Sequence, residues 1–190
     1  MRKILVLDNY DSFTYNLIHY VKELTTDKVD VFRNDKISLS DVAKYDKILL
    51  SPGPGIPSEA GIMPELVAKY GSTKSIFGVC LGQQCIAEVY GGKIFNLDNV
   101  YHGVESEITI VDDDEPLFKG LPQTFTAGRY HSWNIERNGL PNCLKITAVD
   151  NQKMVMAIRH LNYDVRGVQF HPESVLTPLG KQMIKNWLTI

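Results

Sequence analysis

One cysteine, at the junction of a buried strand and a helix, most strongly constrains the fold and the chemistry of this chain. Residues 75–79 are mostly apolar and read as a strand, and residues 81–90 have helical character. Cys80 therefore falls at a sharp strand-turn-helix elbow, where Gly78 and Gly82 relieve crowding. A side chain at the tip of this elbow projects from the sheet, beside the positive end of the helix. The sequence thus predicts nucleophilic cysteine chemistry.

A base for this cysteine is found far downstream. A cysteine after a buried strand is by itself more often a small core residue than a nucleophile. However, residues 167–170 read as a strand that ends just before His171, and Glu173 follows two residues later. In extended backbone these two side chains share a face, and Pro172 keeps His171 out of helical conformation. Thiol, imidazole and carboxylate have the roles of nucleophile, base and orienting group.

A loop of alternating proline and glycine is the third candidate element. Residues 51–57 (SPGPGIP) directly follow the apolar strand at residues 47–50. Such a stiff loop is often only a tight turn, but its glycine amides can approach a ligand closely. Fixed backbone N–H groups are suitable donors to an oxyanion. A phosphate loop is excluded because no Gly-Lys-Ser/Thr follows.

Length and composition exclude several classes of function. A chain of 190 residues fits a single domain, residues 1–190, and a net charge of −2 offers no basic surface for nucleic acid. Cys80, Cys85 and Cys143 leave one thiol unpaired under any disulfide scheme, which favours a reducing compartment. No apolar run approaches the roughly 20 residues of a membrane span. We therefore expect a cytoplasmic protein without membrane contacts.

Strands and helices alternate in the first half of the chain, which predicts an open, mostly parallel α/β sheet with helices on both faces. The second half has short strands joined by turns, which predicts a smaller antiparallel sheet. Candidate strands are residues 4–7, 29–32, 47–50, 75–79, 93–95, 106–111, 144–148, 155–159 and 167–170, and candidate helices 13–24, 40–44, 63–70, 81–90 and 178–188. The Pro-Gly loop, Cys80 and His171 all follow strands, so we expect them to meet at one edge of the sheet.

Five separated segments together resemble the class I (triad-type) glutamine amidotransferases. They are residues 8–16 (DNYDSFTYN), 51–55 (SPGPG), 78–84 (GVCLGQQ), 129–133 (RYHSW) and 169–173 (QFHPE). The first is similar to the opening of one subgroup, the glutamine amidotransferase subunits (component II) of anthranilate synthase and of aminodeoxychorismate synthase. The resemblance runs nearly end to end and implies a flavodoxin-like fold.

The resemblance also implies a role for each matching position. Cys80 would be the nucleophile, His171 the general base and acid, and Glu173 its orienting partner. Glutamine would be held by Gly53, Pro54, Gly55, the Gln84 side chain and the backbone of Ser132 and Trp133. The oxyanion would be bound by N–H groups of the Gly53–Gly55 loop and of Leu81.

The implied reaction is hydrolysis of L-glutamine through a cysteine thioester, with no cofactor and no metal. Its ammonia would go to a larger chorismate-binding synthase subunit in a heterodimer or heterotetramer, which makes anthranilate for tryptophan or, alternatively, 4-amino-4-deoxychorismate for folate. Tyr10, Asp11, Phe13 and Tyr15 are candidate contacts with that partner, although Phe13 could equally pack in the core. The isolated chain is expected to be a slow glutaminase.

Two positions depart from the family pattern, and two other functions stay open. Gln83 stands where histidine is frequent, which should alter packing only, and Val104 stands where lysine is common, which places a substrate or partner contact there in doubt. A γ-glutamyl hydrolase uses related chemistry, but the NYDSFT opening argues against it. A non-catalytic regulatory or binding subunit is the alternative of another class, and the intact Cys80, His171 and Glu173 argue against that.

Overall fold

Nine strands form one sheet, and two more form a small separate one, in a computed structural model that describes residues 1–190. The strands are β1 (Lys3–Asp8), β2 (Lys28–Arg33), β3 (Lys47–Leu50), β4 (Ser75–Val79), β5 (Ile94–Asn96), β6 (Val104–Ile110), β7 (Thr124–Arg129), β8 (Trp133–Ile135), β9 (Leu144–Asp150), β10 (Val155–His160) and β11 (Val165–Val168). The helices are α1 (Thr14–Leu24), α2 (Met63–Tyr70), α3 (Leu81–Val89) and α4 (Gly180–Thr189), with 3₁₀ turns η1 (Asp41–Lys44), η2 (Pro57–Glu59) and η3 (Pro116–Phe118).

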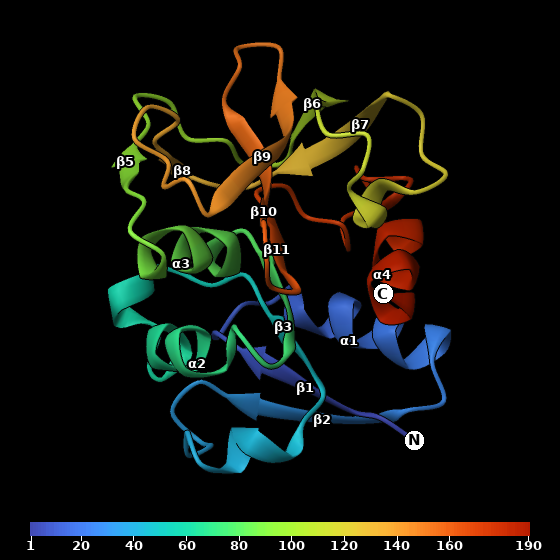
Figure 1. The fold of residues 1–190 in the computed structure, drawn as a ribbon. Coiled ribbons are helices and arrows are strands. Elements are labelled where there is room, and N and C mark those ends of the chain that lie inside the picture. Colours follow the sequence, from blue (N-terminus) through green and yellow to red (C-terminus); the bar gives the residue numbers. More distant parts are fainter.

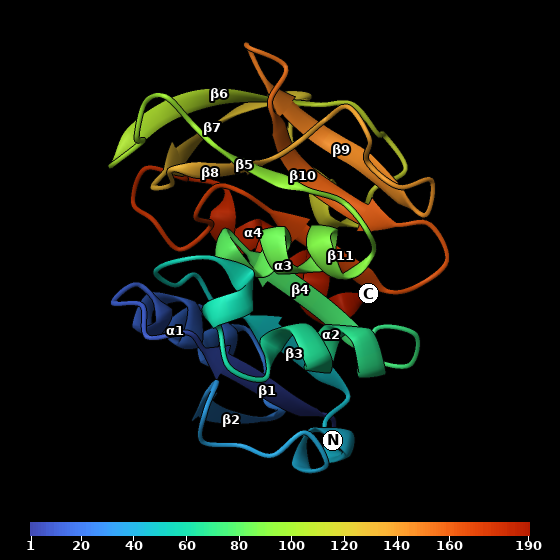
Figure 2. The same ribbon diagram turned by 90° about the vertical axis from the view of Figure 1, so that its left-hand side faces the viewer.

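The large sheet has a parallel half and an antiparallel half. Its order is β2-β1-β3-β4-β11-β10-β9-β6-β7, with parallel pairing from β2 to β11 and antiparallel pairing from there to β7. The predicted α/β class is therefore confirmed. Most of the antiparallel strands continue the central sheet, and only β5 and β8 form a separate small antiparallel sheet, which lies near β6 and β7 (Figure 2).

Helices cover both faces of the parallel half, as the sequence predicts. Along β1, Ile4 and Val6 pack in one apolar cluster, whereas Leu5 and Leu7 pack in another, because successive strand residues point to opposite faces. The first cluster includes residues of α1 and α4, and the second includes residues of α2 and α3. Figure 1 shows these two pairs of helices on opposite sides of the sheet. None of the helices is both long enough and apolar enough to cross a bilayer.

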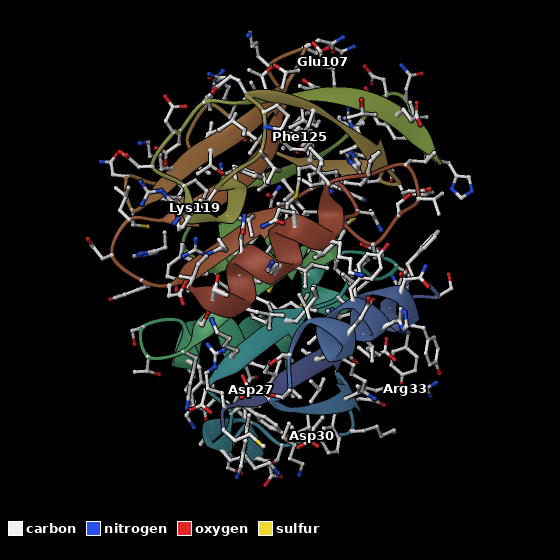
Figure 3. All side chains as sticks on the ribbon, turned by 90° about the vertical axis from the view of Figure 1, so that its right-hand side faces the viewer. Asp27, Asp30, Arg33, Glu107, Lys119 and Phe125 are labelled. Atoms are coloured by element: carbon white, nitrogen blue, oxygen red, sulfur yellow. The ribbon has the colours of Figure 1, made fainter.

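The two outer edges of the large sheet are far in strand order from its centre. Asp30 and Arg33 belong to β2 at one edge of the sheet, while Glu107 of β6 and Phe125 of β7 belong to its other edge (Figure 3). Both edges are remote in strand order from β4 and β11, which are neighbours in the middle of the sheet.

Strand β11 differs from its predicted range. The predicted strand at residues 167–170 in fact spans Val165–Val168, paired in parallel with Ile76–Val79. Gln169 and Phe170 lie beyond the strand, although the Gln169 amide still donates to the carbonyl of Met156 at 2.8 Å. Strands β7 and β8 were not predicted, because β8 has only three residues and β7 is defined by its pairing with distant β6.

The parallel arrangement brings four segments together at the carboxyl ends of the strands. The chain leaves β1, β3, β4 and β11 at their carboxyl ends, and in a parallel sheet these ends lie together. Asn9 follows β1, Ser51 follows β3 and Cys80 follows β4. Since Gln169 follows β11, the segment with His171 also lies at the carboxyl ends of these strands.

Candidate active site

Cys80 occupies a strained backbone position between β4 and α3. Its φ of 52° and ψ of −102° lie where residues other than glycine are rarely found. A Cβ added to Gly78 would lie 2.5 Å from the carbonyl carbon of Gly82, and one added to Gly82 would lie 2.8 Å from the carbonyl oxygen of Leu50. Only glycine fits at either position, so both glycines are required by the close approach of helix and sheet.

The backbone of the elbow is fixed by hydrogen bonds on both sides. The Cys80 amide donates to the carbonyl of Val168 at 2.8 Å, which extends the pairing of β4 and β11 by one residue. At the start of α3, the Gln84 amide donates to the Cys80 carbonyl at 3.1 Å. The amides of residues 81–83 therefore have no carbonyl of their own helix to bind. One of them, Leu81, directly follows the sulfur-bearing residue.

His171 and Glu173 form a buried pair close to this cysteine. Nδ1 of His171 lies 2.7 Å from Oε1 of Glu173, and each residue is only 2% exposed. Burial alone would disfavour the protonated ring, but the Glu173 carboxylate and the Cys80 thiol outweigh it and raise the pKa of His171 well above 6.5. The other ring nitrogen, Nε2, is buried without a hydrogen-bond partner.

The pairing arises from a turn and not from the extended backbone that the sequence suggested. The Ser174 amide donates to the His171 carbonyl at 3.2 Å, which closes a turn through Pro172 and Glu173. The extended-strand explanation was wrong because β11 ends three residues before His171. The turn is anchored to β7, since the His171 amide donates to the Gly128 carbonyl at 3.0 Å.

Aromatic rings cover the imidazole of His171. Tyr130 contacts it at a centroid distance of 4.9 Å and Phe13 at 5.7 Å, both nearly edge to face. The neighbouring Asp11 is half-buried, and this burial raises the pKa of its carboxyl group, partly offset by the Phe13 amide and by His171. The segment before α1 thus forms part of the wall around the predicted base.

Asn9 packs against the Pro-Gly loop and is hydrogen-bonded to its first residue. A Cβ on Gly53 would lie 2.6 Å from both Cβ and the carbonyl oxygen of Asn9, so the loop rests directly on this residue. The Asn9 amide donates to Oγ of Ser51 and its Nδ2 donates to the Ser51 carbonyl, each at 2.8 Å. Gly55 has a φ of 73°, which favours glycine. The loop is thereby held in one conformation.

A cavity of about 220 Å³ lies between the Pro-Gly loop and the start of α3, and Cys80 is one of the residues that line it. The predicted residues Gly53, Pro54, Gly55, Cys80, Gln84, Ser132 and Trp133 line it together with Val100, Tyr101, His102, Tyr130 and His131. The side chain of Gln84 is held in the lining, because its Nε2 donates to the Trp133 carbonyl at 3.0 Å. The size of the cavity suits a small polar substrate.

The segment at residues 100–102 had no predicted role. It has no regular secondary structure, and backbone hydrogen bonds hold it in place: the Tyr101 amide donates to the His131 carbonyl and the Gly103 amide to the Arg129 carbonyl, each at 3.0 Å. These bonds join residues about 30 positions apart. No local signal in the sequence could have placed this segment over the cavity.

A buried ion pair, Arg129–Asp150, adjoins the segment at residues 130–133 that lines the cavity. Arg129 Nη1 lies 2.8 Å from Oδ2 of Asp150, and both side chains are at most 2% exposed. Arg129 also stacks on the ring of Tyr101, 3.6 Å from its centroid, and Nε donates to Nε2 of His131 at 3.0 Å. The cavity wall is therefore rigid and carries a positive charge that is already paired.

The two departures and the predicted partner contacts lie outside the cavity. Gln83 is fully buried with no partner for either polar atom of its amide, and Val104, 40% exposed, begins β6. Of the predicted contacts, Tyr10 and Tyr15 are exposed, with Tyr15 at 77%. Phe13 packs on Tyr130 and His171, so it belongs neither to the free surface nor to the main core clusters.

The site combines a thiol on a strand-to-helix elbow, an imidazole–carboxylate pair beside it, and a small cavity lined in part by a Pro-Gly loop, which is the arrangement expected of a cysteine hydrolase. The family described as glutamine amidotransferase class-I matches residues 5–190. The chain belongs to the class-I glutamine amidotransferase family.

The chain is also similar to individual proteins of plants and bacteria. The chain is 47% identical over 191 residues to anthranilate synthase β subunit 1, chloroplastic, of rice (Oryza sativa), which covers 97% of this chain and 66% of the rice protein. The chain thus spans slightly less than two thirds of that relative. It is 43% identical over 187 residues to aminodeoxychorismate/anthranilate synthase component 2 of Bacillus subtilis, covering 97% of this chain and 95% of the relative.

A solved structure supports the same fold. A crystal structure from Thermoplasma acidophilum, described as one subunit of GMP synthase, superposes with a TM-score of 0.87 at 27% identity. The match covers all of this chain and 93% of the other.

Proposed function

We propose that this chain is the glutamine-hydrolysing subunit of a chorismate-aminating synthase. The single observation that carries the proposal is the buried His171–Glu173 pair beside Cys80, which itself lines a small cavity together with the Gly53–Gly55 loop. The names of the rice and Bacillus relatives support the synthase context.

In the proposed mechanism the sulfur attacks the side-chain amide carbon of glutamine. A protonated His171 ring favours a negatively charged sulfur beside it, and Glu173 holds that ring by Nδ1. The C–N bond breaks as His171 gives its proton to the leaving ammonia. Water, deprotonated by His171, then cleaves the γ-glutamyl thioester and releases glutamate.

Backbone amides are proposed to bind the oxyanion that forms in both steps. The Leu81 amide has no partner within its helix, and the Gly53–Gly55 loop stands across the cavity. Such fixed donors need no reorganisation as charge develops. Gln84 already uses both N–H groups of its amide, on Trp133 and Gln169, so its carbonyl oxygen is the group left to accept from the substrate ammonium.

Two acceptor pathways fit the relatives equally well. The Bacillus relative carries both names, aminodeoxychorismate and anthranilate synthase component 2. We propose anthranilate synthesis first, with aminodeoxychorismate synthesis as the second candidate, in a heteromeric complex with the large subunit. Reconstituting the chain with each large subunit, chorismate and glutamine tests this choice: the product formed identifies the pathway, and no product with either would contradict the proposal.

A further inference from the structure

Gln169, which lies just beyond β11, contacts the sulfur of Cys80 directly. Its side chain is fully buried, and its Nε2 lies 3.4 Å from Sγ of Cys80, within hydrogen-bonding distance of sulfur. The other end of the same amide, Oε1, accepts a hydrogen bond from Nε2 of Gln84 at 3.1 Å. Nothing in the predicted triad or oxyanion loop accounts for this contact.

The direction of these bonds is set by the Trp133 carbonyl. A carbonyl oxygen only accepts, so Gln84 must turn its NH₂ group toward Trp133, and the second N–H of that group points at Gln169. Gln169 must therefore turn its oxygen to Gln84 and its NH₂ group to the sulfur. A flip of the Gln84 amide would place two acceptors face to face, and a flip of the Gln169 amide would place two donors face to face.

The Trp133 carbonyl is itself held in place by His131, which Arg129 holds in turn. Arg129 donates to Nε2 of His131, which leaves the ring proton on Nδ1 to donate to the Trp133 carbonyl at 2.8 Å. Burial, together with the Arg129 charge, lowers the pKa of His131 to about 3, so this ring stays neutral near pH 7. Asp150 holds Arg129 in turn. A continuous chain of directed hydrogen bonds thus joins a buried ion pair to the nucleophile.

We propose that Gln169 is a further residue of the catalytic centre, which donates a hydrogen bond to the Cys80 sulfur, aims it into the cavity and stabilises its negative charge. This inference rests on the proposed function, in which that sulfur is the nucleophile. An N–H donor strengthens its bond when the acceptor becomes anionic, so the contact favours the reactive form. Gln169 does not line the cavity, so its loss should reduce kcat and leave KM nearly unchanged.

The test compares Gln169→Met with Gln83→Met. Both residues are fully buried glutamines, but the Gln83 amide has no partner, so the same substitution there removes no hydrogen bond. We expect Gln169→Met to lower kcat about 10- to 100-fold, the effect of losing a bond to a charged group. Gln83→Met should keep kcat within about threefold of wild type.

Alkylation of Cys80 by iodoacetamide across a pH series distinguishes a hydrogen bond from Gln169 to the sulfur from a purely structural role of Gln169. In Gln169→Met, Cys80 should be alkylated about tenfold more slowly than in wild type at each pH, with no such slowing in Gln83→Met. Gln169→Asn, whose amide is too short to reach the sulfur, should behave like Gln169→Met and serves if the latter does not fold.

Two outcomes overturn this inference without touching the glutaminase proposal. They are an unchanged alkylation profile in folded Gln169 variants, and a kcat within about threefold of wild type. If instead the wild-type chain with its large subunit hydrolyses no glutamine, the proposed function fails, while the alkylation profile still reports on the contact between Gln169 and the sulfur.

Discussion

Nδ1 of His171 lies 2.7 Å from Oε1 of Glu173, and neither side chain is more than 2% exposed. A carboxylate so close to a buried ring fixes its tautomer and leaves Nε2 as the nitrogen that we propose transfers the proton. The turn at Pro172 and the anchor on Gly128 create this geometry. The pair is the most constrained part of the candidate site.

Replacing Glu173 with glutamine should keep the shape of the site and remove its charge. We expect glutaminase kcat to fall by about 10²- to 10⁴-fold, because the protonated His171 ring loses its counter-charge and its fixed tautomer. Steady-state glutamate release by the wild-type and Glu173→Gln proteins checks this. Activity within tenfold of wild type would remove Glu173 from the mechanism.

The same pair predicts a dependence of stability on pH. Burial opposes it, but Glu173 and Cys80 raise the pKa of His171 above 6.5. The protonated ring therefore stabilises the fold fully below pH 6.5, and this contribution is lost as pH rises through the raised pKa. The excess unfolding free energy of wild type over Glu173→Gln, measured by urea titration, should shrink from neutral to alkaline pH. A growing difference would contradict the assigned direction.

Gly82 in α3 offers a test in which two effects have opposite signs. Helix propensity alone predicts that Gly82→Ala stabilises by about 0.5–1 kcal/mol. A Cβ there would lie 2.8 Å from both Cβ and the carbonyl oxygen of Leu50, so we expect destabilisation of about 1–3 kcal/mol instead. Urea unfolding decides the sign. A higher midpoint than wild type would show that the elbow is less tightly packed than described.

The Arg129–Asp150 pair should be costly to break from one side. Both side chains are almost fully buried, so Asp150→Asn leaves an uncompensated guanidinium in the protein interior. We expect a loss of about 3–5 kcal/mol of unfolding free energy. KM for glutamine should also rise, because His131 and the Trp133 carbonyl depend on Arg129. A double variant, Arg129→Met with Asp150→Leu, is the control and should recover part of the stability.

Tyr15 is the predicted partner contact with the most exposed ring, at 77%. Tyr15→Ala should weaken binding of the large subunit by about tenfold or more, as for other aromatic anchors, and leave basal glutaminase activity unchanged. Tyr163→Ala is the control, because Tyr163 is also exposed, at 39%, and precedes the amino end of β11, whereas Tyr15 lies near the carboxyl end of β1. Titration calorimetry measures both variants. Equal affinities for Tyr15→Ala and wild type would place the interface elsewhere.

Local sequence signals predicted the parallel half of the fold well. The strand at residues 47–50 and the helix at residues 63–70 coincide with β3 and α2, because each is a short periodic run with clear ends. The elbow was recognisable for the same reason, since the glycines around Cys80 satisfy steric needs within five residues.

Features that depend on distant pairing could not be predicted. Strand β7 exists through its ladder with β6, and the Tyr101 segment is placed by bonds to His131 and Arg129. The bond between Gln169 and Cys80 likewise joins residues 89 positions apart. Sequence spacing gives no information on such contacts, which is why the residues around the sulfur were only partly foreseen.

Labelling with a glutamine-analogue electrophile, 6-diazo-5-oxo-norleucine, followed by peptide mass spectrometry, tests the central claim most directly. The chain has three thiols, and burial raises the pKa of Cys85, which leaves that thiol unreactive. We predict a single adduct on the peptide that carries Cys80, protected by glutamine and absent in Cys80→Ala. An adduct confined to Cys85 or Cys143, or glutamine hydrolysis that survives in Cys80→Ala, would contradict the account.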